Sequence, residues 1–282
     1  MTPAIFLQDC IAAIRKRLVN ESARVAEFLD RNLSVMLGGW AVLTLVFGAI
    51  RLTALIVAHP QLARLPLVAD LIFSYALIAA SPLAAYALIA RSFPKDRLPV
   101  QPAIRLCHFG KWSSVSPTDA RDRPEFGMSG LLVSLVAGLL LSISMRMIEY
   151  FLAMPAVPNM APDWAVTMFR LMTFDLVFFG FLYTVCIGMA LRAAPLFPRM
   201  LCYTWICDLL MQLAIARHMA GVVGLPGDVA QALEPYVLVN IKKILISVVI
   251  WLPYLIVSNR INLTFRLRVR FDQTSGMRAR PA

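Results

Sequence analysis

The sequence predicts an all-α fold, a polytopic membrane helix bundle with six transmembrane spans, and three observations lead to it. Hydrophobic residues make up 60 % of the 282 positions and charged residues only 15 %, whereas soluble domains are about half apolar and a quarter charged. The mean hydropathy is +0.73. Apolar runs of about 20 residues, enough to cross a bilayer at about 1.5 Å per residue, recur along the chain.

Residues 1–33 are predicted to form a cytoplasmic amphipathic helix. Apolar side chains recur there at three- and four-residue steps, and cationic side chains flank them. Two interpretations remain open: the helix lies in the membrane interface against anionic lipids, or it packs on the protein's own cytoplasmic side. No cleavable signal peptide is expected, because the first long apolar run begins only near Ser34. The residues of the apolar stripe are Leu7, Ile11, Ile14, Leu18, Val25 and Leu29.

The six apolar spans are predicted at 34–58, 66–90, 128–153, 164–191, 200–222 and 235–258. Lys and Arg accumulate in cytoplasmic segments, so their distribution predicts the orientation. Of the 27 Lys and Arg residues, twenty lie in the N-terminal segment, the loop after span two, the link after span four and the C-terminal tail. The opposite connections hold one, Arg64. Both termini are therefore predicted to be cytoplasmic.

Two cytoplasmic segments separate or follow the spans. The loop 91–127, which divides spans 1–2 (34–90) from spans 3–6 (128–258), is rich in Pro and Arg. It is too short for a core of its own and is interpreted as an irregular tether. The tail 259–282 is basic and is interpreted as a membrane-surface anchor. Within the spans, Pro82 and Pro253 predict kinks, and the small residues of 79–85 predict close approach of a neighbouring helix.

Charged side chains gather in the predicted outer halves of the spans, and each span contributes at least one. Asp208 is the deepest, near the middle of span five. A charge in the bilayer is costly, and a carboxylate is too short to reach the headgroups, so Asp175 and Asp208 require a cationic partner or water. Six cations against four anions leave a surplus of about two positive charges. The ten candidate binding residues are Arg51, Asp70, Arg146, Glu149, Arg170, Asp175, Asp208, Arg217, Lys242 and Lys243.

Two interpretations of these charges remain open. They line an outward-facing polar cleft that accepts anionic groups, or they form ion pairs that hold the helices together, for example Arg146 with Glu149 on one helix face. Asp208 favours the functional interpretation, because it is the most expensive to bury.

Several function classes are not supported by the sequence. The five cysteines and three histidines show no metal or redox spacing, so no metal site and no cofactor is predicted. No P-loop, nucleophile elbow or HExxH motif occurs, so we expect no enzyme activity. The basic residues are scattered between hydrophobic spans rather than grouped on one face, which argues against nucleic-acid binding.

Two separated phrases resemble the bacterial membrane protein family known as domain of unknown function 2569. Gly38-Gly39-Trp40 is similar to its opening, and the segment from Trp251 to Phe265, with Pro253, Tyr254 and Arg260, is similar to its closing signature. Together the phrases bracket nearly all six spans. The resemblance implies a bacterial inner-membrane location and no established activity.

The leading hypothesis is therefore a protein that binds or translocates a small anionic solute or lipid headgroup. The second is a non-catalytic accessory or assembly subunit that docks a membrane-protein partner or another copy of itself through the N-terminal helix and the 91–127 loop. A lipid-modifying enzyme is the third and is the weakest, because no nucleophile–base or metal constellation accompanies it.

Overall fold

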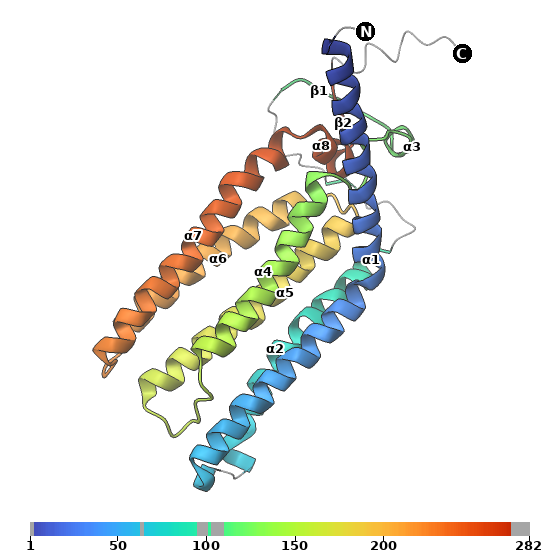
Figure 1. Cartoon of the computed structure of the whole chain (residues 1–282). Coiled ribbons are helices and arrows are strands. Elements are labelled where there is room, and N and C mark those ends of the chain that lie inside the picture. The colour runs from blue at the N-terminus through green and yellow to red at the C-terminus, as the bar shows by residue number, and fades with distance from the viewer. Residues whose placement is uncertain (1–2, 63–64, 95–100, 103–109, 272–282) are drawn as a thin grey trace.

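A computed structural model describes residues 3–62, 65–94, 101–102 and 110–271 of the chain (Figure 1). The helical bundle confirms the predicted all-α membrane fold. Its elements in chain order are α1 (Pro3–Ala58), the short 3-10 helix η1 (Pro60–Leu62), α2 (Leu65–Ser92), β1 (Trp112–Ser114), α3 (Pro117–Arg121), α4 (Leu131–Ala153), α5 (Asp163–Leu191), α6 (Phe197–Ala220), α7 (Gly227–Val257), α8 (Asn259–Arg266) and β2 (Arg268–Arg270).

Six of the described helices contain a stretch long and apolar enough to cross a membrane, as the sequence predicts. The chain is thus a multi-pass membrane protein. The most buried of the six is α5, and it is the central helix, packed against α2, α4 and α6. The stretches are Asn20–Ala58, Val68–Ser92, Leu131–Ala153, Asp163–Leu191, Phe197–Ala220 and Gly227–Val257.

The first helix is continuous across the boundary that the sequence analysis places between residues 33 and 34. A buried stripe with helical spacing, which includes Ala26, Leu29, Leu33, Leu37 and Trp40, packs on the rest of the protein. The C-terminal part of the predicted amphipathic segment 1–33 is therefore packed against protein rather than lying on lipid. The side chains of the predicted stripe residues Leu7, Ile11, Ile14 and Leu18 lie outside the described residues.

The interface of α2 with α1 and α5 is closely packed because glycines remove side chains where the helices meet. A Cβ atom on Gly188 would lie 2.7 Å from Ile89 Cγ2, and one on Gly48 would lie 2.9 Å from the Tyr75 ring. Ser81 Oγ donates a hydrogen bond to the Val177 carbonyl at 2.6 Å. The predicted close approach along residues 79–85 is confirmed. The helices α2 and α7 continue through Pro82 and Pro253.

The described parts of the loop and the tail fold together into a small cap at the end of the bundle where α1 begins (Figure 1). Strands β1 and β2 pair antiparallel, with Ser113 opposite Val269. Ala120 from the loop packs with Leu263 and Val269 from the tail in a separate small core. The interpretation of the loop as a plain tether is therefore incomplete, because it shares a core that neither segment could form alone.

The closing phrase of the chain holds this cap in place. Thr264 Oγ1 accepts a hydrogen bond from Gly127 N at 3.0 Å, and Phe265 is fully buried against Phe197, with ring centroids 5.0 Å apart. The carbonyls at the end of α7 bind Asn262 and Arg266. The membrane-anchor interpretation is wrong for Thr264 and Phe265, because their side chains are enclosed by protein rather than lipid.

Candidate polar site between α4 and α7

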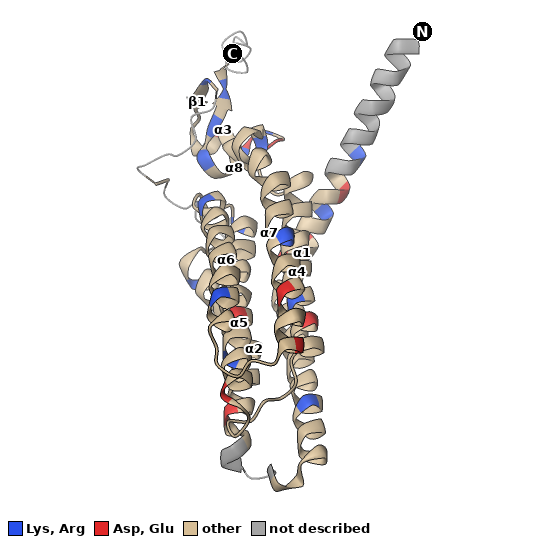
Figure 2. Cartoon of the chain, turned by 90° about the vertical axis from the view of Figure 1, so that its left-hand side faces the viewer, with Lys and Arg blue, Asp and Glu red and all other residues tan. Residues whose placement is uncertain are grey.

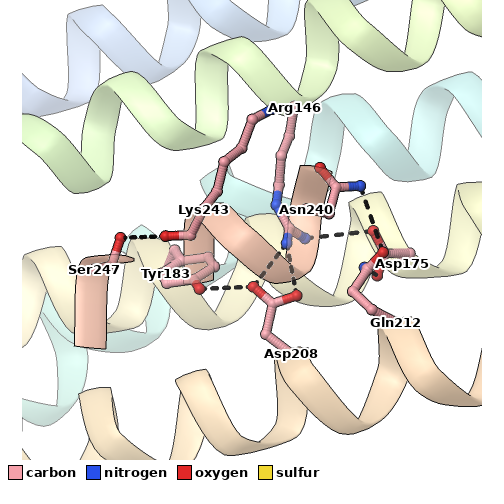
Figure 3. Close-up of polar contacts among 8 residues, drawn as sticks. All are labelled: Arg146, Asp175, Tyr183, Asp208, Gln212, Asn240, Lys243 and Ser247. Carbon is pink, nitrogen blue, oxygen red and sulfur yellow. Dashed lines mark hydrogen bonds and ion pairs between the residues drawn. The ribbon is translucent and has the colours of Figure 1, made fainter. Parts of the chain in front are cut away.

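Three charged side chains from three helices meet inside the bundle (Figure 3). Arg146 on α4 donates from Nη2 to both carboxylate oxygens of Asp208 on α6, at 2.6 and 2.7 Å. Its Nη1 donates to Oδ2 of Asp175 on α5, at 3.3 Å. The guanidinium also lies over the ring of Phe179, 5.2 Å from its centroid. We call Arg146, Asp175 and Asp208 the central cluster.

Neutral polar side chains complete the central cluster. Tyr183 donates its hydroxyl to Asp208 Oδ2 at 2.7 Å, and Gln212 donates from Nε2 to Asp175 Oδ1 at 3.0 Å. Asn240 on α7 donates to Gln212 Oε1 at 3.4 Å. The chain of contacts from Arg146 through Gln212 thus extends to α7, so four membrane-spanning helices share one polar network.

The central cluster lies near the middle of the membrane-spanning part of the bundle. Asp208 is fully buried at the centre of the 24-residue helix α6, roughly 17 Å along the helix axis from either end. A buried charge is tolerated only when it is paired and hydrogen-bonded, and the two contacts from Nη2 of Arg146 supply both. The requirement for a cationic partner, inferred from the sequence, is met by a residue 62 positions away.

A pocket of about 350 Å³ reaches this cluster from between α4 and α7. Arg146, Asp208 and Tyr183 lie at its inner wall, and Glu149 pairs with Lys243 along its side. Lys243 is half exposed and Glu149 about a quarter exposed, so both are open to an incoming molecule. The apolar lining of this α4–α7 pocket includes Leu141, Met145, Ile244 and Ile246.

Five of the ten candidate binding residues come together at this place: Arg146, Glu149, Asp175, Asp208 and Lys243. The charges that meet are therefore two cations and three carboxylates, and the predicted positive surplus is absent here. The suggested pair of Arg146 with Glu149 does not form, because each binds a partner on another helix. Positively and negatively charged residues occur at several levels along the length of the bundle (Figure 2).

The other five candidates lie elsewhere. Arg51 donates to the backbone carbonyls of Phe151 and Leu152, at 2.8 and 3.1 Å, at the end of α4. Asp70 and Arg170 are exposed and both bind Asn159, the Arg170 contact being 3.1 Å. Arg217 and Lys242 are exposed on α6 and α7, outside the α4–α7 pocket.

Tyr183, Gln212 and Asn240 were not predicted from the sequence, although a signal points to each of the two amides. Gln212 follows Asp208 by four positions, which places both on one helix face. Asn240 is a polar residue within a span, where an amide needs a hydrogen-bond partner. Tyr183 had no such signal, because tyrosines are also common in ordinary bundle packing. Among the described residues, no three His, Cys, Asp or Glu side chains gather into a group that could hold a metal ion.

Comparisons of the chain with protein-family models, with curated proteins and with solved structures find no match. The resemblance to domain of unknown function 2569 stays a prediction. The described contacts give its closing phrase a structural role, since Arg260 Nη1 donates to the Gly127 carbonyl at 3.4 Å and Thr264 binds the same residue. Function must therefore be argued from the site itself.

Proposed function

We propose that this protein binds, and in a transport cycle translocates, an amphiphile or small solute with a zwitterionic headgroup in the α4–α7 pocket. The observation that carries the proposal is a pocket at mid-membrane depth whose wall holds an accessible cation, Lys243, beside an accessible carboxylate, Glu149. Sites near the bilayer midplane lined by intramembrane charges are typical of substrate pathways.

The balance of charge favours a zwitterion over the purely anionic solute that the sequence analysis predicts. An anion would meet Lys243, but it would also meet Glu149 and Asp208 with no cation in excess. A phosphoethanolamine group places its phosphate on Lys243 and its ammonium on Glu149, so that neither protein charge loses its partner. The apolar wall formed by Leu141, Met145 and Ile246 suits an acyl chain that enters sideways between the helices.

The proposal includes the context predicted from the sequence: a multi-pass protein of a bacterial inner membrane, with both termini cytoplasmic and no catalytic role. It is supported by the excess of Lys and Arg in the N-terminal segment, the 91–127 loop and the tail, whose described residues lie at one end of the bundle.

Headgroup binding can be measured by the thermal shift of detergent-solubilised protein on titration with three probes. These are phosphatidylethanolamine, the anionic phosphatidylglycerol, and soluble glycerophosphoethanolamine. We expect stabilisation by phosphatidylethanolamine above that by phosphatidylglycerol. If the soluble compound also stabilises the protein, a free solute is sufficient as ligand. If only the lipid stabilises it, the ligand is a lipid.

The adjacent lysines offer a matched pair of variants. Lys243→Gln should weaken binding about 10- to 100-fold, since hydrogen bonds to charged groups contribute about 1.5–3 kcal/mol. Lys242→Gln, which removes the same charge outside the α4–α7 pocket, should leave binding unchanged. Equal effects of the two variants would rule out the proposal. Stronger binding of phosphatidylglycerol than of phosphatidylethanolamine would favour the anionic ligand that the sequence predicts.

A second candidate is the accessory or assembly subunit, favoured by the length of α1. This helix begins at Pro3, well before the membrane-spanning stretch that starts at Asn20, and projects past the other helices (Figure 1). Together with the cap it offers a docking surface for a partner. Native mass spectrometry of protein solubilised from its own membrane distinguishes the two, because a stoichiometric partner protein favours the subunit and a retained lipid favours the binding protein.

A further inference from the structure

The charges of the central cluster do not cancel, and this imbalance points to a property of the protein other than headgroup binding. Arg146 is one cation shared by two carboxylates, so the cluster carries a net charge of −1 when both are ionised. The side chains of Asp175 and Asp208 are 12 % and 0 % exposed, and that of Arg146 is 14 % exposed. An excess charge in so enclosed a place is strongly disfavoured.

The surrounding groups do not supply the missing positive charge. Glu149 and Lys243 pair with each other and add no net charge. Tyr183 and Tyr236 are neutral at pH 7, and Ser81, which α2 contributes near this part of α5, does not titrate. The titratable and charged groups around the cluster are Arg146 and Glu149 from α4, Tyr183 from α5, Asp208 from α6, and Tyr236 and Lys243 from α7.

The two carboxylates are not equivalent in their contacts. Asp208 receives both of its oxygen contacts from the guanidinium at 2.6 and 2.7 Å, and a hydroxyl at 2.7 Å besides. Asp175 receives one guanidinium contact at 3.3 Å and one neutral amide contact at 3.0 Å. Charge-assisted contacts favour the ionised form. Asp208 is thus the carboxylate of the pair with Arg146, and Asp175 is the one left over.

We propose that Asp175 is a proton-binding site at the centre of the membrane-spanning bundle, occupied in the folded protein and discharged through the α4–α7 pocket. With the proton bound, the central cluster is neutral. The protonated carboxyl donates to Gln212 once the amides of Gln212 and Asn240 both turn by 180°, because an amide offers an acceptor on one side and donors on the other. Gln212 Nε2 then donates to Asn240 Oδ1, so the contact between the two amides is kept. Asn240, which binds Gln212, lies at the pocket wall and links Asp175 to it.

Release of the proton has a defined consequence for the pocket. The O–H bond of the Asp175 carboxyl breaks, the electron pair stays on the carboxylate, and a water molecule takes the proton as hydronium. The new charge attracts Nη1 of Arg146, which already lies 3.3 Å away, and competes with Asp208 for the guanidinium. Since Asp208 and Arg146 both line the α4–α7 pocket, the proton on Asp175 changes the charge that a bound headgroup meets.

Infrared spectroscopy tests the inference directly, because a protonated carboxyl has a C=O stretching band that a carboxylate lacks. At pH 7 the full-length protein in lipid nanodiscs should show such a band, and alkaline pH should abolish it. Asp175→Asn should remove the band. Asp208→Asn should remove it as well, because Arg146 then has a single carboxylate to pair with and Asp175 ionises.

The neighbours of the two carboxyls tell them apart: Gln212→Leu, beside Asp175, should shift the band, and Tyr183→Phe, beside Asp208, should leave its position unchanged. Asp70→Asn, which changes an exposed aspartate, is the control that retains the band. Wild-type protein without the band, or a band shifted by Tyr183→Phe and not by Gln212→Leu, overturns the assignment.

Thermal unfolding gives a second readout. The wild-type midpoint should fall as pH rises through the titration of Asp175, because deprotonation leaves an unbalanced charge in the folded protein and a solvated one in the unfolded chain. Asp175→Asn, an isosteric neutral replacement, should lack this fall. If that variant fails to fold, the infrared band of the wild-type protein and its loss at alkaline pH decide alone. The inference does not depend on headgroup binding, which can fail in the lipid titrations while the carboxyl band persists.

Discussion

The interface between α2 and α5 and the one between α4 and α7 are built by opposite means. Along α2 and α5, glycine and serine allow the backbones to approach, and Gly188 leaves no room even for a methyl group beside Ile89. Between α4 and α7, charged side chains and a pocket separate the helices. Close packing of small residues stabilises membrane helices without polar groups, whereas intramembrane charges mark sites of function. Under the proposed function, the interfaces of α2 with α1 and α5 are the scaffold and the α4–α7 side, to which α5 contributes Asp175 and Tyr183, is the working part.

The largest effect should follow from removing the shared cation of the central cluster. Arg146→Met leaves two carboxylates without their partner, and breaking a buried ion pair costs about 3–5 kcal/mol. Reversible unfolding in mixed micelles measures this loss. The triple variant Arg146→Met, Asp175→Leu, Asp208→Leu should recover most of the stability, because no charge remains uncompensated. If the triple variant recovers stability and still binds lipid headgroups normally, the cluster is purely structural and the contrast fails.

A smaller loss should come from overpacking the scaffold. The added methyl of Gly188→Ala would lie within 3.1 Å of three Ile89 side-chain atoms, and overpacking typically costs about 1–3 kcal/mol. Gly39→Ala is the matched control, since a Cβ there meets nothing within 4 Å; it should stabilise the helix by about 0.5–1 kcal/mol. Headgroup binding should be unaffected by both. Equal stabilities of the two variants would show that α2 and α5 are not closely packed.

Removal of the interhelical hydrogen bond of Ser81 should have a modest effect. Ser81→Ala loses the donor to the Val177 carbonyl, and such bonds between membrane helices contribute about 0.6 kcal/mol on average. The expected change in unfolding free energy is therefore well below that of Gly188→Ala. A loss above about 2 kcal/mol would mean that the α2–α5 interface depends on polar contacts as the α4–α7 side does.

The smallest effect is expected at the exposed polar group near the other end of the bundle. Arg170→Ala removes a 3.1 Å contact to Asn159 at an exposed position, where substitutions usually change stability by no more than about 0.5 kcal/mol. Unfolding and lipid titration should both match the wild type. A clear loss of binding would extend the working part of the molecule beyond the α4–α7 pocket.

How far the sequence predicts this molecule depends on the range of the interactions. The spans of α4 and α5 are predicted to within three residues, because hydropathy is a local property of about 20 consecutive residues. The cap was not predicted, since β1 and β2 are separated by more than 150 positions in the chain and neither carries a strand pattern of its own. The charges of the working part were all identified, but not their partners.

By itself the sequence determined that this chain spans a membrane six times and that Asp208 needs a partner there, because the cost of removing backbone and charge from water depends on residue type alone. Only the tertiary structure decided that the partner is Arg146, that Asp175 shares it, and that Lys243 lines the pocket while the exposed Lys242 does not. Those outcomes depend on how the helices rotate and pack against one another, and packing of distant segments leaves no local trace in the order of the residues.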